Sequence, residues 1–126
     1  MFSIKRLKEI MKMLPDSADP RIGGSCALYF YGIVDSYRDI DIIVDSIKDI
    51  NLSFPKIEFI HKNRLNKGIK YCIDGQEVDV LENIVNNPII VHDTISNLNF
   101  VGLEDIYEAK RRINDFISLQ NGNSNS

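Results

Sequence analysis

The apolar and polar positions of the chain follow a helical period near both ends. Ser3 is placed to cap a helix that runs to about residue 14, with apolar residues every three or four positions. Residues 103–119 repeat this spacing after a glycine and predict a longer helix. An apolar block at 25–34 follows a glycine pair, and it predicts a short helix packed into the core.

The middle of the chain has the residues and spacing of β-strands. β-branched residues between 38 and 45 predict a central strand. The pair Asp74-Gly75 is a strong signal for a two-residue hairpin turn. Further strands are predicted at 57–61, 69–73, 76–81 and 89–91. The whole pattern predicts an α+β fold, a mixed β-sheet with helices packed on it.

Length and composition support one such domain. The chain has 126 residues, of which 44% are hydrophobic and 26% charged, as in ordinary soluble globular proteins. We expect a single domain over residues 1–120 and a disordered polar tail at 121–126. Cys26 and Cys72 match no metal-finger spacing and are predicted to be buried reduced thiols. No apolar stretch is long enough to span a membrane, so we expect a cytoplasmic protein.

The net charge limits the kind of ligand. It is −3 at pH 7, so no overall field attracts nucleic acid, and an anionic ligand would have to meet local cations or a metal ion. A basic group lies between residues 56 and 70, made of Lys56, Lys62, Arg64, Lys67 and Lys70. We interpret it as a solvated turn, unless it borders a pocket, where it would guide a polyphosphate or an RNA end.

Two acids interrupt the most apolar strand. Residues two apart in a strand project from the same face, so Asp39 and Asp41 are predicted to lie together. Two like charges at this spacing cost stability unless a cation lies between them, and Mg²⁺ prefers such oxygen ligands. Asp79 is likewise bracketed by aliphatic residues, on the strand after the predicted turn. We predict that the three carboxylates converge on one or two Mg²⁺ ions that carry a nucleotide.

The glycine pair upstream fits a phosphate ligand. Gly23 and Gly24 let a backbone approach closely, and Ser25 with the start of the next helix offers N–H and O–H donors. Isolated glycines are more often turn residues, and an Asp-x-Asp pair often has no function. The combination of these features is what favours a nucleotide site.

Gly-Gly-Ser, then about a dozen residues, then Asp-x-Asp between aliphatics and a later single Asp resemble the DNA polymerase beta type nucleotidyltransferase superfamily. The resemblance is to its minimal members and to the nucleotidyltransferases of toxin–antitoxin and abortive-infection systems. It covers residues 21–81 and, more loosely, the segment "GLEDIYEAKRR" in the last helix. It implies the nucleotidyltransferase fold, with transfer of a nucleoside monophosphate from an NTP such as ATP to a hydroxyl or phosphate acceptor and release of pyrophosphate.

The resemblance also implies a role for each motif residue. Two Mg²⁺ ions would be bound by Asp39 and Asp41, and Asp79 would complete the metal site and orient or deprotonate the acceptor. The nucleotide phosphates would be held by Gly23, Gly24 and Ser25, with Lys110 reaching the triphosphate. The acceptor stays open between RNA, protein and a small molecule. The alternative is a non-catalytic module of a toxin–antitoxin pair, binding a nucleotide or a partner protein on the same fold.

Overall fold

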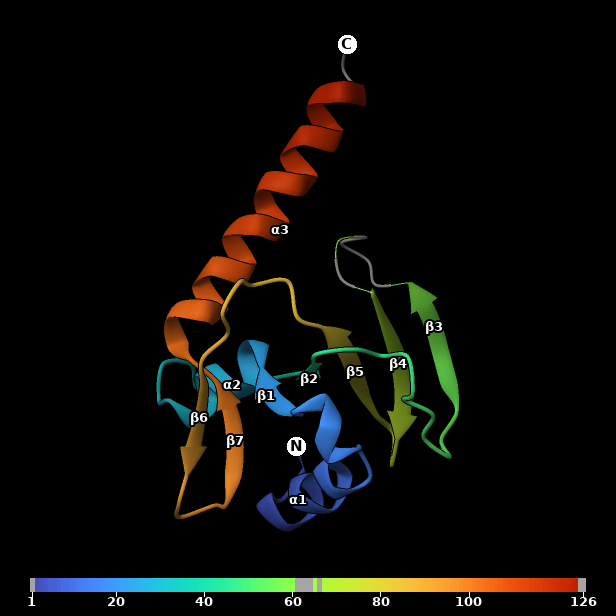
Figure 1. Cartoon of the computed structure of the whole chain (residues 1–126), viewed down its shortest axis with the longest axis vertical. Coiled ribbons are helices and arrows are strands. Elements are labelled where there is room, and N and C mark those ends of the chain that lie inside the picture. Colours follow the sequence, from blue (N-terminus) through green and yellow to red (C-terminus); the bar gives the residue numbers. More distant parts are fainter. Residues whose placement is uncertain (1, 61–64, 66, 125–126) are drawn as a thin grey trace.

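A seven-stranded mixed sheet forms the centre of the chain. The computed structural model describes residues 2–60, 65 and 67–124, and within them the strand order is β3-β4-β5-β2-β1-β7-β6 (Figure 1). The strands are β1 (Arg21–Gly23), β2 (Ile40–Val44), β3 (Lys56–Ile60), β4 (Lys67–Ile73), β5 (Gln76–Glu82), β6 (Ile90–Asp93) and β7 (Leu98–Val101). The helices are α1 (Ile4–Lys12), α2 (Gly24–Phe30) and α3 (Leu103–Ser124), with a short 3₁₀ turn at Asp16–Ala18. The predicted α+β class is confirmed.

The sheet mixes parallel and antiparallel neighbours. Strands β2 and β5 run parallel, as do β1 and β7, and the other four neighbouring pairs run antiparallel. The centre of the sheet therefore joins segments that are distant in the sequence, whereas the β4–β5 and β6–β7 hairpins join adjacent ones.

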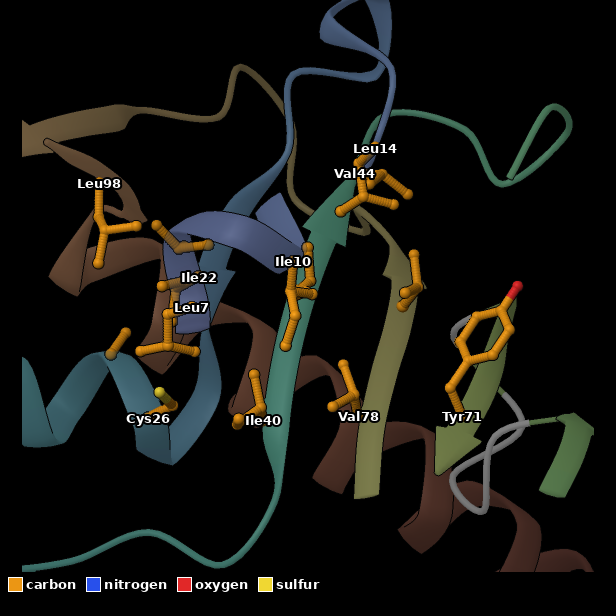
Figure 2. Close-up of a cluster of buried hydrophobic side chains, with 14 of the residues drawn as sticks. Leu7, Ile10, Leu14, Ile22, Cys26, Ile40, Val44, Tyr71, Val78 and Leu98 are labelled. Carbon is orange, nitrogen blue, oxygen red and sulfur yellow. The ribbon is translucent and has the colours of Figure 1, made fainter. Parts of the chain in front are cut away.

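One face of the sheet carries the main core, under α1 and α2. In β2 the residues Ile40, Ile42 and Val44 are fully buried, while Asp41 and Ile43 between them are only partly buried. This alternation assigns the even positions to the core face and the odd ones to the opposite face. Figure 2 shows the core cluster, which includes Leu7, Ile10, Leu14, Ile22, Cys26, Ile40, Val44, Tyr71, Val78 and Leu98.

Several predicted local signals are present as expected. The side-chain oxygen of Ser3 accepts a hydrogen bond from the Arg6 backbone N–H at 3.1 Å and caps α1. Asp74 and Gly75 connect β4 to β5 with positive φ angles of 52° and 78°, as a type I′ hairpin turn requires. The helix predicted at 25–34 ends earlier, at Phe30.

Other elements differ from the prediction. Strands β1 and β7 were not predicted, because three or four residues are too few to establish a period. Helix α3 continues to Ser124, past the predicted end near residue 119, and so includes part of the tail predicted to be disordered. Once a helix is nucleated by packing, each further residue adds one hydrogen bond, so polar residues can extend it.

Some predictions fall on residues outside the described ranges. Among them are the last residue of the strand predicted at 57–61, Lys62 and Arg64 of the basic group, and the final two residues of the tail. In the part of the chain that is described, none of the helices combines the length and apolarity needed to cross a bilayer.

Candidate functional site

A row of register partners, three of them with charged side chains, crosses the sheet on the face opposite the main core, and we call it the polar row. Gly23 of β1 is the register partner of Asp41 in β2, and Asp41 is the partner of Asp79 in β5. Asp79 is in turn opposite Lys70 in β4. Directly opposed residues on neighbouring strands project to the same face, and the strands lie about 4.8 Å apart. The fold therefore brings two of the three predicted aspartates side by side.

Asp39 is placed differently from the prediction. It is half-buried and lies one residue before β2, which begins at Ile40, so strand alternation does not fix its direction. The first register pair of β2 is Ile40 with Val78 of β5, and β1 already ends opposite Asp41. The backbone just before Asp39 is nevertheless held, since the Gln76 side-chain amide donates to the carbonyl oxygen of Arg38.

The three aspartates do not form a ready-made metal cage. Among the described residues, no group of three or more His, Cys, Asp or Glu side chains is arranged to hold a metal ion. Asp41 and Asp79 are neighbours by register, and Asp39 lies two residues before Asp41 in the chain. Metal binding by this set would thus require the carboxylates to move from these positions.

The backbone geometry at Gly24 explains why glycines occupy the turn beside Asp41. It has a φ of +56°, and a Cβ added there would come closer than 3.0 Å to the carboxylate of Asp41. A Cβ on Gly23 would meet Ile43 at 2.8 Å. The turn from β1 into α2 therefore passes directly against the Asp41 side chain, which only residues without a side chain allow.

A cavity of about 150 Å³ opens beside this turn, between the sheet and α3. Gly23, Gly24 and Asp41 line one part of it, and Lys110 of α3 lines another. The rest of its wall is mostly aliphatic and includes Ile43, Leu81, Ile84, Val85, Val101, Ile106 and Ile113. Of the predicted site residues, Gly23, Gly24, Asp41 and Lys110 thus share one cavity, whereas Ser25, Asp39 and Asp79 are not among its lining residues.

An ion-pair network within helix α3 is linked to the cavity wall by a hydrogen bond from Arg112. Glu108 accepts hydrogen bonds from Arg111 at 2.6 Å and from Arg112 at 2.9 Å, and these bonds lower the pKa of its carboxyl to about 2. Arg112 also donates to the carbonyl oxygen of Ile84 at 2.7 Å. Because Ile84 forms part of the cavity wall, the network ties the helix to the segment that follows β5.

Lys70 is the site residue that the sequence interpretation missed. The ammonium nitrogen lies 3.2 Å from Oδ1 of Asp79 and 3.2 Å from Oε2 of Glu77, and the residue is only 9% exposed. Burial lowers the pKa of this lysine, but the bonds with Glu77 and Asp79 outweigh burial and raise it. The interpretation of Lys70 as part of a solvated turn is therefore wrong. Counting outward from the Asp74-Gly75 turn would have paired residue 70 with residue 79.

Both cysteines are free thiols in the structure. Cys26 is buried in α2, and this burial raises the pKa of its thiol to about 12. Cys72 is partly buried on β4. Neither takes part in the polar row, so the chemistry of the site rests on carboxylates, a lysine and backbone groups.

Comparison with known proteins adds one solved structure. No protein-family model matches the chain, and no curated protein matches it. A Thermotoga maritima protein, provisionally described as a nucleotidyltransferase, has a crystal structure that superposes with a TM-score of 0.68 over 96% of this chain and 90% of that one. The chain has a nucleotidyltransferase fold. At 17% identity the likeness extends to the fold alone.

Proposed function

We propose that this protein transfers a nucleoside monophosphate from an NTP to a hydroxyl or phosphate acceptor, with the help of Mg²⁺ and with release of pyrophosphate. The observation that carries the proposal is the register of Asp41 and Asp79 on the parallel β2–β5 pair, beside the Gly23-Gly24 turn. Paired carboxylates next to a close backbone turn, on a nucleotidyltransferase fold, match the needs of a metal-bound triphosphate.

The metal would be held by Asp41 together with Asp39. Their carboxylate oxygens are hard donors of the kind that Mg²⁺ prefers. When bound, the ion would neutralise negative charge on the phosphates and polarise the α-phosphoryl group. The sequence also assigned Asp79 to the metal, but the Lys70 ion pair favours the other role implied for it, contact with the acceptor.

Transfer then requires one bond to form and one to break. The acceptor oxygen attacks the α-phosphorus, and the bond from that phosphorus to the pyrophosphate oxygen breaks. If the acceptor is a hydroxyl, the Asp79 carboxylate, beside Asp41, would orient it by accepting its hydrogen bond, and the proton would leave to solvent water as the new bond to phosphorus forms. The ammonium of Lys110, across the cavity from the turn, would meet the negative charge of the triphosphate, while the backbone at Gly24 and Ser25 would contribute N–H donors.

The test is an assay for incorporation and pyrophosphate release. The protein is incubated with labelled NTPs, Mg²⁺ and a mixture of RNA, protein and small-molecule acceptors. Asp41→Asn keeps the size of the side chain and removes its charge, and it is expected to lower the rate by on the order of 100-fold or more. Asp49→Asn, an exposed acid in the connection after β2, is the matched control and should leave the rate unchanged. Equal rates for the wild type and Asp41→Asn would refute the role of Asp41.

Two observations favour a second function, binding of a nucleotide or partner protein without catalysis. Asp79 already has a cationic partner, and the described residues contain no ready-made three-acid metal site. A pure binder would gain about 2.7 kcal/mol of stability from Mg-NTP present at 100 times its Kd, and it would release no pyrophosphate from any NTP. Thermal unfolding with and without Mg-NTP, beside the pyrophosphate assay, separates the two functions. A partner protein from a toxin–antitoxin pair would belong to this second function.

A further inference from the structure

Asp79 and Lys70 are two enclosed charges on the site face of the sheet. Their side chains are 5% and 10% exposed, whereas that of Glu77 is 48% exposed. The ammonium nitrogen of Lys70 lies 3.2 Å from Oδ1 and 3.4 Å from Oδ2 of Asp79. Both oxygens of the third predicted metal ligand are thus within reach of a resident cation.

The lysine bridges two acids that belong to one strand. Glu77 and Asp79 are two residues apart in β5 and project from the same face, and Lys70 on the neighbouring strand contacts both. This is the same spacing as Asp39 and Asp41, and two like charges at this spacing need a cation for stability. For the pair in β5 the chain supplies that cation itself.

We propose that the ammonium of Lys70 is the resident cation of Asp79 and takes the place of a second divalent ion, so that the site binds a single divalent ion near Asp41. The inference rests on the proposed function for the ion near Asp41, but its own claim concerns Asp79. It replaces the two-ion site that the family resemblance implies with one ion and one lysine.

The physical reason is competition for one buried carboxylate. A divalent ion that bound Asp79 would lie close to the ammonium of Lys70, and the two positive charges would repel each other in a poorly solvated place. The ion could bind only if the lysine left, and a lysine with 10% of its side chain exposed has little solvent to move into. Removing the ammonium should therefore create a metal site at Asp79.

The arrangement also defines what Asp79 can do. A carboxylate held by an ammonium stays ionised and keeps a fixed position, which suits a group that orients an acceptor hydroxyl. Lys70 would then be a positioning residue, acting on the reaction through Asp79.

The experiment counts bound Mn²⁺ by electron paramagnetic resonance, with and without a non-hydrolysable NTP. Four proteins are compared, namely the wild type, Lys70→Met, the double variant Lys70→Met with Asp79→Asn, and Lys67→Met. Lys67 is an exposed lysine on the same strand and serves as the matched control. We expect Lys70→Met to bind one more Mn²⁺ per chain than the wild type, and we expect the double variant and Lys67→Met to show no such gain.

The same number of Mn²⁺ ions in Lys70→Met and in the wild type would overturn the inference. If Lys70→Met fails to fold, the number of bound Mn²⁺ ions is measured instead in Asp79→Asn, made in the wild-type background. An unchanged Mn²⁺ count in Asp79→Asn supports the inference, and the loss of one ion overturns it.

A different result of the same experiment would count against the proposed function. A wild type that binds no Mn²⁺ even with the nucleotide would count against metal-dependent transfer. A gained ion in Lys70→Met would support the role of Lys70 in that case too.

Discussion

Replacing Gly24 with alanine tests whether the turn from β1 into α2 is built around the Asp41 carboxylate. Gly24 has a φ of +56°, a backbone conformation that costs an L-residue about 1–2 kcal/mol. The added methyl group would also lie closer than 3.0 Å to the Asp41 carboxylate, a separation that real Cβ atoms essentially never show. Overpacking of this kind typically lowers the free energy of unfolding by about 1–3 kcal/mol. Gly24→Ala is therefore expected to lose about 2–5 kcal/mol of unfolding free energy.

Gly32 provides the matched control. It has a φ of +78° just after the end of α2, and a Cβ added there would meet nothing within 4 Å. Gly32→Ala carries the conformational cost alone and is expected to lose about 1–2 kcal/mol. Urea unfolding followed by circular dichroism gives both values, and their difference isolates the contact with Asp41.

A double-mutant cycle makes the test specific to Asp41. In an Asp41→Ala background the carboxylate is gone, so Gly24→Ala should cost at least about 1 kcal/mol less than it does in the wild type. The cost of Gly32→Ala should be the same in both backgrounds. If Gly24→Ala costs no more than Gly32→Ala, or if its cost does not depend on Asp41, then the glycine is not there to accommodate the carboxylate.

Two further predictions concern polar contacts outside the Asp41–Asp79 pair. Glu108→Gln should lower the melting temperature at pH 7. The difference in melting temperature from the wild type should shrink as the pH falls from about 4.5 towards 2, because a carboxyl with a lowered pKa stabilises the fold only while it is ionised. A difference that does not depend on pH would contradict this. Tyr71→Phe should cost about 1–2 kcal/mol in urea unfolding, because the buried N–H of Leu52 loses its acceptor at 3.2 Å. Tyr107→Phe, half-exposed on α3, is its control, and an equal cost in the two variants would disprove the role of the Leu52 bond.

Local signals were enough to predict the elements that have them. The capping serine of α1, the apolar period of α3 and the Asp74-Gly75 turn each act over a few residues, and each is found where it was predicted. A two-residue hairpin fixes the register of both its strands, so the sequence already determined that Lys70 lies opposite Asp79.

For the acids too, one part of their placement followed from local sequence and another part did not. The sequence placed Asp41 and Asp79 on apolar strands, but their alignment depends on the parallel β2–β5 pair, which no turn connects and which forms only when the core packs. The position of Asp39 just outside β2 follows from the pairing of β2 with β5, which begins at Ile40.

The sequence by itself thus determined the residue types, the strand faces and the hairpin register, because these follow from backbone periodicity and turn geometry. Only the tertiary structure decided which acids become neighbours, how deeply Lys70 is buried and where the cavity beside α3 opens. Those features depend on contacts between segments far apart in the chain, whose pairing is set by packing rather than by local sequence.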